Sequence, residues 1–512
     1  MTGTVHLVGA GPGDPGLITL RAAELLQRCD CVIYDYLANP ELLELVPDAA
    51  ERCYVGKIGA QGDQARPPET GEARGRRGNW KQDDINALLL AKARQHASVV
   101  RLKGGDPLMF GRGGEEALAL REAGIPFSIV PGVTAGIAVP AYAGIPVTHR
   151  DCASSVVFVT GREKPGKERS AHDWDALAGI GTLVLYMGVS KLPEISRELI
   201  ARGRDPQTPA AMIQWGTYPR QRVLNADLAS LPERAHGAGM GSPSVVVIGQ
   251  VAALREHMAW YDTRPLFGKR VVVTRANAGA SRLSQLLREA GAEALEWPAM
   301  DLRDAPAAAL DAAIAALPGH DWVAFSSANA VRAMARRLAV RQLDARAFAP
   351  CRIAAVGPAT ATALADMGLR ADLIPEQADA SGLAQALLAA GARQVLLPQA
   401  DNARPEVAEQ LRAGGAMVSA IAVYEAVPIT ERRDLNQAGA IDAVTFASAA
   451  TVERFCQQVR PADRQTLIRQ GCRFVAIGPR TAEALQTAGL PLAATAQEPS
   501  LPALVAALAA SF

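Results

Sequence analysis

The sequence predicts an α/β protein made of two consecutive α/β blocks. At 512 residues the chain is too long for one hydrophobic core, so two or three domains are expected. In the first block, from Val5 to about Trp260, strand-like apolar runs alternate with helical segments, which is typical of parallel sheets covered by helices. In the second block a strand–helix pattern occurs twice, which indicates a duplication.

Apolar runs of strand length mark the sheet of the first block. They are Val5–Val8, Cys31–Tyr34, Val99–Leu102, Ser128–Val130, Val156–Thr160, Thr182–Tyr186 and Val245–Ile248. Helices are expected between several of them, over Ile18–Arg28, Asp83–Gln95 and Gly114–Ala123.

A domain boundary is expected at the segment that begins with Tyr261, because a new apolar strand starts directly after it at Val271. The predicted domains are residues 1–260 and 265–512.

An internal repeat organises the second block. Phe325-Ser-Ser-Ala-Asn-Ala-Val recurs 121 residues later from Phe446, and Val356-Gly-Pro-Ala-Thr recurs at the same offset from Ile477. A third pair relates the strand at Val271 to the one at Val395. The second block is therefore predicted to form two similar open α/β lobes, and the cleft between such lobes is a usual place for a ligand.

Charge and cysteine usage exclude several classes of protein. The net charge of +1 provides no global field that would attract nucleic acid or an anionic membrane. The uncharged stretch Ala123–His149 contains four prolines, which favours buried loops and short elements over a membrane helix. No Cys-x-x-Cys pair and no export signal are present, so we expect no structural metal, reduced thiols and a cytoplasmic location.

Two glycine-rich loops indicate the ligand of the first block. The stretch Gly9–Gly16 follows a strand and contains the Gly-x-Gly-x-x-Gly fingerprint of dinucleotide sites, with Asp35 at the end of the next strand. Pro12 and Pro15 argue against a dinucleotide, because proline lacks the N–H groups that bind a pyrophosphate. A second such loop, Gly104–Gly114, also follows a strand. Two strand-end loops of small residues suit a compact, cationic ligand without phosphates, such as S-adenosylmethionine.

The motifs of the first block resemble uroporphyrinogen-III C-methyltransferase over about residues 3 to 258. They are Gly9-Ala-Gly-Pro-Gly-Asp14, Tyr34-Asp35, Val55-Gly-Lys57, Arg101-Leu-Lys-Gly-Gly-Asp-Pro107, Phe110-Gly-Arg-Gly-Gly-Glu115, Val130-Pro-Gly-Val-Thr-Ala135, Tyr142-Ala-Gly-Ile-Pro-Val-Thr-His-Arg-Asp151 and Tyr186-Met-Gly188. The resemblance implies two methyl transfers from S-adenosylmethionine to uroporphyrinogen III, which give precorrin-2, and a homodimer through this domain.

The resemblance also implies roles for individual residues. Asp35 matches the proton acceptor of the family and Lys57 its proton donor. The implied S-adenosylmethionine contacts are Pro12, Gly104, Gly105, Asp106, Met109, Thr134, Ala135, Met187 and Gly216. Because the substrate carries eight carboxylates, basic side chains are expected to anchor it, namely Arg101, Lys103, Arg112 and Arg150. The stretch Gln61–Trp80 departs from the family, and we interpret it as a tolerated insertion rather than a basic lid.

The second block resembles uroporphyrinogen-III synthase over roughly residues 268 to 512. The resemblance rests on the opening Val271-Val-Val-Thr-Arg275, on the repeated turns and on Val423-Tyr424. It implies a bilobal duplicated α/β domain with flavodoxin-like lobes, between which the chain crosses and returns, and cyclisation of hydroxymethylbilane without a cofactor or metal. Tyr424 would assist departure of the hydroxyl group. Residues at the strand-to-helix turns would bind the carboxylates, namely Arg275, Ser326, Ser327, Asn329, Thr360, Ser448 and Thr481.

Two alternatives remain open for the function of the chain. The second block could be a non-catalytic module that binds a tetrapyrrole, or the first block could methylate a related substrate. The coupling of the two resemblances favours a bifunctional enzyme of tetrapyrrole biosynthesis, because the product of the second block is the substrate of the first. Small-molecule tetrapyrroles are the expected partners, and neither nucleic acid nor a membrane is expected.

Overall fold

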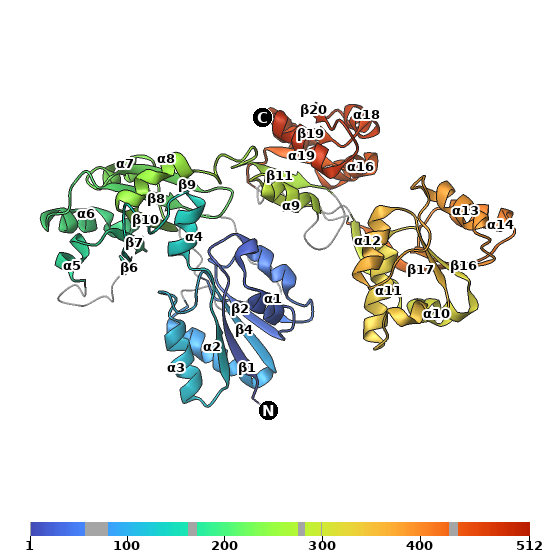
Figure 1. The fold of residues 1–512 in the computed structure, drawn as a ribbon, viewed down its shortest axis with the longest axis horizontal. Coiled ribbons are helices and arrows are strands. Elements are labelled where there is room, and N and C mark those ends of the chain that lie inside the picture. Colours follow the sequence, from blue (N-terminus) through green and yellow to red (C-terminus); the bar gives the residue numbers. More distant parts are fainter. Residues whose placement is uncertain (1, 57–79, 162–171, 275–281, 298–299, 430–438) are drawn as a thin grey trace.

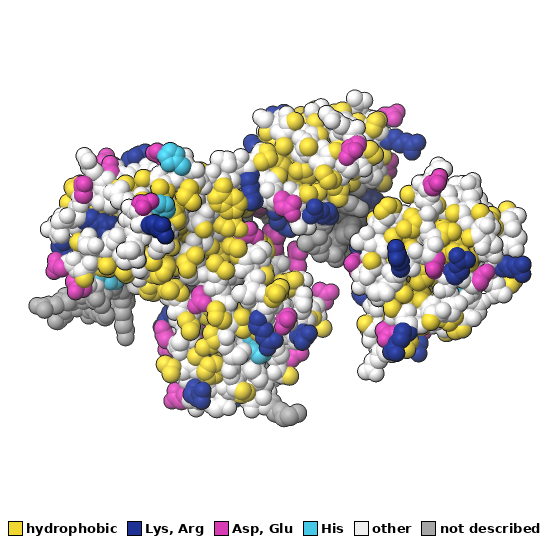
Figure 2. Space-filling model, in the orientation of Figure 1, with side chains coloured by type: hydrophobic (Ala, Val, Ile, Leu, Met, Phe, Trp, Pro, Cys, Tyr) yellow, Lys and Arg dark blue, Asp and Glu magenta, His cyan; other side chains and the backbone are white. Residues whose placement is uncertain are grey.

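The computed structural model describes residues 2–56, 80–161, 172–274, 282–297, 300–429 and 439–512. The described residues form four five-stranded sheets, and each sheet is the centre of one lobe. Figure 1 shows the first lobe in blue, the second in green, the third in yellow-green and red, and the fourth in yellow and orange, and Figure 2 shows the same view in space-filling form. Apolar clusters lie on both faces of every sheet, so each lobe is a layered α/β unit.

The first lobe contains a wholly parallel sheet in the order β3-β2-β4-β1-β5. Its strands are β1 (Thr4–Gly9), β2 (Cys31–Tyr34), β3 (Glu51–Tyr54), β4 (Ser98–Lys103) and β5 (Phe127–Val130). Its helices are α1 (Leu20–Leu26), α2 (Gln82–Gln95) and α3 (Gly113–Glu122), with 3₁₀ turns η1 (Pro15–Leu17) and η2 (Pro40–Leu45). All four residues of β2 are buried, as expected for a central parallel strand.

The second lobe corrects the expectation of parallel strands throughout the first block. Its strands are β6 (Val156–Thr160), β7 (Thr182–Tyr186), β8 (Pro209–Gln214), β9 (Arg222–Asp227) and β10 (Ser244–Ile248), in the order β6-β7-β10-β8-β9. Only β6 and β7 pair in parallel, whereas β10 pairs antiparallel with both β7 and β8, and β8 with β9. β9 was not among the predicted strands, because its side chains are only partly buried and it is not an apolar run.

Among the described residues, five helices accompany the second sheet. They are α4 (Ala135–Tyr142), α5 (Trp174–Ala178), α6 (Leu192–Ala201), α7 (Leu231–Gly237) and α8 (Arg255–Met258), with 3₁₀ turns η4 (Val189–Lys191) and η5 (Gln250–Leu254). The proline-rich stretch in which no membrane helix was expected holds β5 and the short helix α4. Within the described part of the chain, we find no helix with the length and apolar character needed to cross a bilayer.

The third lobe has five parallel strands in the order β12-β11-β18-β19-β20, which is the flavodoxin-like order. The strands are β11 (Arg270–Val273), β12 (Glu293–Glu296), β18 (Ala443–Phe446), β19 (Arg473–Ala476) and β20 (Leu492–Thr495). The helices are α9 (Arg282–Glu289), α16 (Ala449–Gln458), α17 (Pro461–Arg469), α18 (Pro479–Thr487) and α19 (Leu501–Ala510).

The fourth lobe is inserted into the third between β12 and β18. Its strands are β13 (Met300–Asp304), β14 (Trp322–Phe325), β15 (Arg352–Ala355), β16 (Gln394–Ala400) and β17 (Met417–Pro428), in the order β13-β17-β16-β14-β15. Only β13 runs antiparallel to its neighbour. The helices are α10 (Ala307–Ala316), α11 (Ala328–Val340), α12 (Pro358–Asp366), α13 (Ala380–Ala389) and α14 (Glu406–Ala413), with 3₁₀ turns η6 (Leu317–Gly319) and η7 (Ala345–Phe348).

The sequence repeat explains this insertion. The neighbours β12-β11-β18-β19 of the third lobe match β17-β16-β14-β15 of the fourth, strand for strand. One copy of the repeat therefore supplies β11, β12, β14 and β15, and the other supplies β16 to β19. Each lobe combines half of each copy, so the lobes do not coincide with the repeats, as the family resemblance implied.

Candidate active sites

Three loops meet at the carboxyl ends of β4, β1 and β5, which are neighbours in the first sheet. The loops after β1 and β4 are joined by hydrogen bonds from Gly11 N to Gly105 O at 3.2 Å and from Gly105 N to Gly11 O at 2.7 Å. A Cβ atom on Gly132, in the third loop, would lie 2.3 Å from Gly105 O. Only glycine permits this close packing of three backbones.

Asp106 holds the second and third loops together. Its Oδ1 accepts hydrogen bonds from the N–H groups of Leu108 at 2.8 Å and Met109 at 3.2 Å. Its Oδ2 accepts one from Gly132 N at 3.1 Å. Both carboxylate oxygens are therefore used to fix backbone, which makes Asp106 a loop-positioning residue in this structure.

The second lobe contributes to the same place through Tyr186, at the end of β7. Its hydroxyl lies 2.6 Å from Thr134 Oγ1 and accepts a hydrogen bond from Gly136 N at 2.6 Å. Burial raises the pKa of Tyr186, although these two hydrogen bonds oppose the rise. The next residue, Met187, is 45% exposed and has a left-handed φ of 51°.

The loop after β8 also packs against this site. A Cβ atom on Gly216 would lie 2.3 Å from Val139 Cγ1 of α4, so Gly216 packs directly on that helix. The neighbouring Thr217 accepts a hydrogen bond from Asp14 N to its Oγ1 at 3.0 Å. The structure thus brings together loops that carry all the residues expected to contact the methyl donor, namely Pro12, Gly104, Gly105, Asp106, Met109, Thr134, Ala135, Met187 and Gly216.

The geometry of these loops fits a ligand without phosphate groups. Gly105 has a left-handed φ of 69°, and a Cβ atom there would still lie 3.7 Å from its nearest neighbour, Ala135 N. The space beside this glycine is therefore open to a ligand atom. The loops offer backbone groups and small side chains, whereas the nearby cations Arg101 and Lys103 are turned into the protein, so the chemistry of the site suits a compact cation better than a pyrophosphate.

Asp35 lies after β2, which is the neighbour of β4. Its Oδ2 accepts a hydrogen bond from Arg101 Nη2 at 3.1 Å, and its Oδ1 accepts one from Leu37 N at 3.1 Å. Its side chain is 23% exposed. The carboxylate is therefore held by two donors and still reaches solvent, as a group that exchanges a proton with a substrate requires.

The expectation that Arg101 and Lys103 bind substrate carboxylates has to be corrected. Their side chains are only 3% and 6% exposed, and both donate to Oε1 of the fully buried Glu116, at 3.3 Å and 3.0 Å. Burial lowers the pKa of Lys103 and the nearby Arg101 charge lowers it further, whereas Glu116 opposes both effects. The three side chains form a buried ion cluster that supports Asp35.

The other predicted basic residues have different surroundings. Arg112 begins α3 and pairs with Glu115 through two hydrogen bonds of 2.8 Å and 2.7 Å, and both side chains are exposed. Arg150 is exposed at a turn. Lys57, Arg275 and residues 61–79 of the predicted insertion lie outside the described residues.

The structure brings Tyr424 and Ser327 together in the fourth lobe. The Tyr424 hydroxyl, on β17, lies 3.2 Å from Ser327 Oγ, which also accepts a hydrogen bond from Ala330 N at the start of α11. Ser326 and Asn329 flank this turn and are partly exposed, and Asn329 accepts from Arg332. A phenol hydroxyl is thus hydrogen-bonded to the serine that caps a helix.

The equivalent turns in both lobes begin helices, as expected. Ser448 caps α16 and is exposed, whereas Thr360 in α12 and Thr481 in α18 are only 3% and 4% exposed. A substrate could therefore reach little more than the tips of these two threonines.

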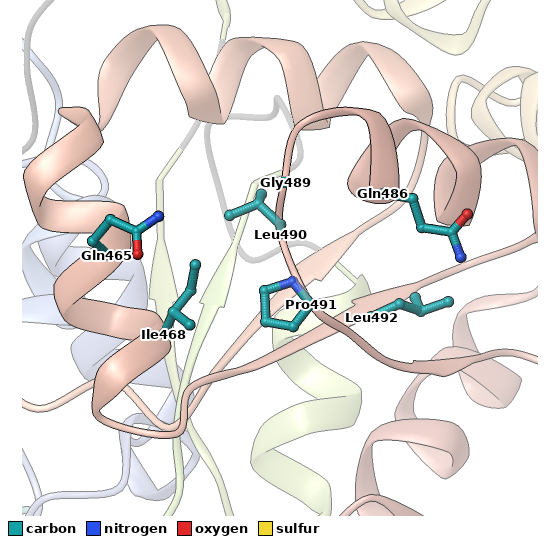
Figure 3. A pocket seen from close by; sticks show the side chains of 7 residues that line it. All are labelled: Gln465, Ile468, Gln486, Gly489, Leu490, Pro491 and Leu492. Atoms are coloured by element: carbon teal, nitrogen blue, oxygen red, sulfur yellow. The ribbon is translucent and has the colours of Figure 1, made fainter.

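A surface hollow of about 680 Å³ lies on the third lobe. Figure 3 shows that it is lined by Gln465, Ile468, Gln486, Gly489, Leu490, Pro491 and Leu492. None of the residues expected to act on a substrate lines it, so its position gives no support for an active site there.

One group of possible metal ligands occurs among the described residues. Cys31, Glu51 and His96 lie with their ligand atoms within 4.8 Å of one another. Glu51 already accepts from Lys92 Nζ at 2.7 Å and contacts His96 Nε2 at 2.9 Å. The ammonium group would repel a metal ion, so we interpret the group as an ion-pair network.

Two residues of the first site were missed by sequence reasoning. Glu116 follows the exposed Glu115 at a helix start, and the sequence showed no sign that it would be buried. Tyr186 belongs to a quoted motif, yet its contact with Thr134 depends on how the second lobe packs on the first. Its place at a strand end was the only available signal.

Comparison with known proteins identifies both halves of the chain. Residues 4–232 match the family profile of Tetrapyrrole (Corrin/Porphyrin) Methylases, and residues 281–506 match that of Uroporphyrinogen-III synthase HemD. The Porphyrin biosynthesis protein HemD of Ruminiclostridium josui is 36% identical over 489 residues, which cover 94% of this chain and 93% of that protein. The Uroporphyrinogen-III C-methyltransferase of Bacillus subtilis is 40% identical over 345 residues, 67% of this chain and 68% of that protein.

Other relatives cover about half of this chain. The Siroheme synthase of Tolumonas auensis is 49% identical over 275 residues, 54% of each chain. The crystal structure of Uroporphyrin-III C-methyl transferase from Thermus thermophilus with S-adenyl homocysteine is 38% identical and covers 49% of this chain and 100% of that one. Its TM-score of 0.41 is too low to support an argument about the fold.

The similarity to the Ruminiclostridium josui protein runs through both profile-matched regions in one alignment. This agrees with the two separate profile matches and with the two resemblances found in the sequence motifs. The chain belongs to the family of two-domain tetrapyrrole-biosynthesis enzymes that carry a tetrapyrrole methylase domain followed by a uroporphyrinogen-III synthase domain.

Proposed function

We propose that the chain makes uroporphyrinogen III and then methylates it. The synthase domain cyclises hydroxymethylbilane to uroporphyrinogen III, and the methylase domain transfers two methyl groups from S-adenosylmethionine to give precorrin-2, a precursor of sirohaem and cobalamin. The observation that carries the proposal is the continuous similarity to the Porphyrin biosynthesis protein HemD of Ruminiclostridium josui, which covers 94% of this chain and 93% of that protein. A methylase fused to the enzyme that makes its substrate forms a two-step sequence.

The loops of the first site support methyl transfer. S-adenosylmethionine would supply an electrophilic methyl group, so the protein mainly has to orient a pyrrole carbon towards it. Pro12, the Gly104–Asp106 loop and Met109 would hold the donor from the first lobe. Thr134, Ala135, Met187 and Gly216 would hold it at the junction with the second lobe.

Asp35 is proposed to accept the proton that leaves the methylated ring. Arg101 orients its carboxylate, and Glu116 pairs with both Arg101 and Lys103, so that two carboxylates balance two cations. Lys57 is proposed as the proton donor. Arg112 and Arg150 remain the exposed candidates for contact with substrate carboxylates.

The proposal is tested with the full chain and two substrates. With hydroxymethylbilane alone we expect uroporphyrinogen of isomer III. Spontaneous closure gives only isomer I, so the formation of isomer III shows catalysis by the synthase domain. With S-adenosylmethionine added we expect mass spectrometry to show a product heavier by two methyl groups. Isomer I as the only product would support the non-catalytic binding module, and methylation of other tetrapyrroles but not of uroporphyrinogen III would support the related-substrate alternative.

Tyr424 is proposed to assist loss of the hydroxyl group in the synthase domain. Replacing it with phenylalanine removes the group that contacts Ser327 but keeps the ring. We expect the rate of isomer III formation to fall about 100-fold, which is the lower end of what one acid–base group contributes. The rate is measured by separating the isomers after short reaction times.

The matched control is Ser327→Ala, which removes the partner of the hydroxyl and the cap of α11. It should lower stability by about 1 kcal/mol and change the rate less than Tyr424→Phe does. If Tyr424→Phe forms isomer III at the wild-type rate, the role of the hydroxyl is wrong although the synthase function stands.

The proposal also includes the boundaries of the two domains and the oligomeric state of the protein. The methylase domain would comprise residues 1–260 and the synthase domain residues 265–512. A homodimer through the methylase domain is proposed, with tetrapyrroles as partners, no metal and a cytoplasmic location.

A further inference from the structure

The joining segment, residues 260–266 between the two domains, is firmly packed. Tyr261 is 3% exposed and its ring centroid lies 4.8 Å from that of Tyr142. Trp260 donates from Nε1 to Ala141 O at 2.9 Å, and Arg255 pairs with Asp262. The joining segment is therefore an extension of the core of the second lobe.

The same segment holds α9 of the synthase domain. Leu266 is fully buried, and its N–H donates to Ala290 O at 2.9 Å. The guanidinium group of Arg264 donates to Arg288 O at 3.3 Å, close to the end of α9, where a positive charge is favourable. The end of α9 is thus fixed relative to the methylase domain. Figure 1 shows the third lobe beside the second lobe and next to the first.

A first chain of contacts leads from α9 to the glycine loop after β1. Arg288 Nη2 lies 2.6 Å from Glu41 Oε2 in η2. The backbone N–H of Glu41 donates to Asn39 Oδ1 at 3.0 Å, and Asn39 Nδ2 donates to Gly13 O at 2.7 Å. Asn39 is only 7% exposed. The synthase domain therefore supports η2, and the cap of η2 supports the loop.

A second chain of contacts starts from the joining segment and ends beside the first. The Tyr261 hydroxyl donates to Thr217 O at 3.2 Å. Thr217 Oγ1 accepts from Asp14 N at 3.0 Å, and Thr217 is 1% exposed. Gly13 packs on the same loop, because a Cβ atom there would lie 2.3 Å from Tyr218 Cε2. Both chains end on adjacent residues of the glycine loop.

The charge of Arg288 affects the pKa of Glu41, its partner in the ion pair. Burial raises the pKa of Glu41 to about 7, and the charge of Arg288 opposes that rise. The other nearby acids, Glu44, Glu293 and Glu296, raise the pKa further. Arg288 is therefore the residue that favours the ionised form of this carboxylate among other negative charges.

We infer that Arg288 of the synthase domain is a positioning residue for the methyl-donor site of the methylase domain. It acts through Glu41 and Asn39 on Gly13, in parallel with Tyr261, which acts through Thr217 on Asp14. This inference rests on the proposed S-adenosylmethionine site. It assigns the synthase domain a second role, which is to stabilise the donor loop of its fusion partner.

The test is a double-mutant cycle on the full chain at pH 8, with Arg288→Ala, Glu41→Gln and both together. Binding of S-adenosylhomocysteine is measured by calorimetry. Each single variant should raise the Kd about fivefold, which corresponds to about 1 kcal/mol. In the double variant the Kd should also rise about fivefold and not about 25-fold, because the two side chains act in one chain of contacts.

A matched control and two further measurements separate positioning from general damage. Arg282→Ala lies on the same helix, and its partner Glu289 is also in the synthase domain, so it should leave the Kd unchanged. Formation of isomer III should stay at the wild-type rate in all variants. Hydrogen exchange of the peptide over residues 9–18 should be faster in Arg288→Ala and in Glu41→Gln, but not in Arg282→Ala.

Wild-type affinity in both single variants would overturn the inference, and so would additive effects in the double variant. If Arg288→Ala does not fold, the Kd of Glu41→Gln alone tests the inference. This variant should fold, because the change keeps the size of the side chain. A wild-type chain that does not bind S-adenosylhomocysteine would instead contradict the proposed function, so the two failures are distinguishable.

Discussion

Replacing Asp35 by asparagine should lower kcat for methyl transfer about a hundredfold or more, because a positioned proton acceptor contributes 10²–10⁴-fold. The amide keeps the size of the side chain and can still accept from Leu37 N, so the loop after β2 should stay in place. Methylated product is measured by mass spectrometry over short times, and binding of S-adenosylhomocysteine by calorimetry. Binding should remain close to that of the wild type.

The separation between turnover and binding decides the role of Asp35. The residue lies after β2, whereas the loops expected to hold the donor follow β1, β4, β5, β7 and β8. If Asp35→Asn abolishes binding of S-adenosylhomocysteine, the carboxylate belongs to the donor site and is not the proton acceptor. Asp30→Asn, at the other end of the same strand, is the matched control and should leave turnover unchanged.

Replacing Glu116 by alanine should destabilise the methylase domain by about 3–5 kcal/mol, the usual cost of removing one partner from a buried ion pair. Glu116 is fully buried and is the carboxylate that both Arg101 and Lys103 contact. Without it, two buried cations remain beside one partly exposed Asp35. The first thermal transition of the full chain should fall by about 10 °C.

The pH dependence of this variant follows from Lys103. Burial lowers the pKa of Lys103, and Glu116 opposes that effect, so the pKa should fall further in Glu116→Ala. A lysine with a lowered pKa in the folded state binds fewer protons than in the unfolded state, so stability rises with pH up to about 10.5. The deficit at pH 7 should therefore become smaller at pH 9.

Glu116→Gln is the control for the volume lost in the alanine variant. It keeps the size of the side chain and removes the charge, so its stability should lie between those of the wild type and Glu116→Ala. Equal stability of all three proteins at pH 7 would show that the buried cluster does not depend on this carboxylate.

The glycine loops and strand–helix alternation were predictable because they depend on local chemistry. Gly105 adopts a left-handed backbone conformation, and Gly132 lies very close to another chain segment. Both conditions favour glycine, and both glycines belong to motifs at strand ends. The helices expected over Asp83–Gln95 and Gly114–Ala123 occur as α2 (Gln82–Gln95) and α3 (Gly113–Glu122), because their apolar residues recur with the helical period. The repeat revealed two similar lobes because the same turns recur at a constant offset.

Pairing between distant strands was not predictable from such local signals. The antiparallel β10 has the same apolar composition as a parallel strand, since both are buried on two faces. The exchange of half-repeats between the third and the fourth lobe depends on where the chain crosses. That choice leaves no mark in the composition of the strands.

The sequence by itself determined which residue types the first site contains and in which loops they lie. Only the tertiary structure decided how those residues are used. Arg101 and Lys103 looked like anchors for a polyanion, yet the fold turns both towards the buried Glu116, 15 and 13 residues further along the chain. Burial converts a cation from a ligand-binding group into a structural one, because a desolvated charge needs a fixed partner of opposite sign.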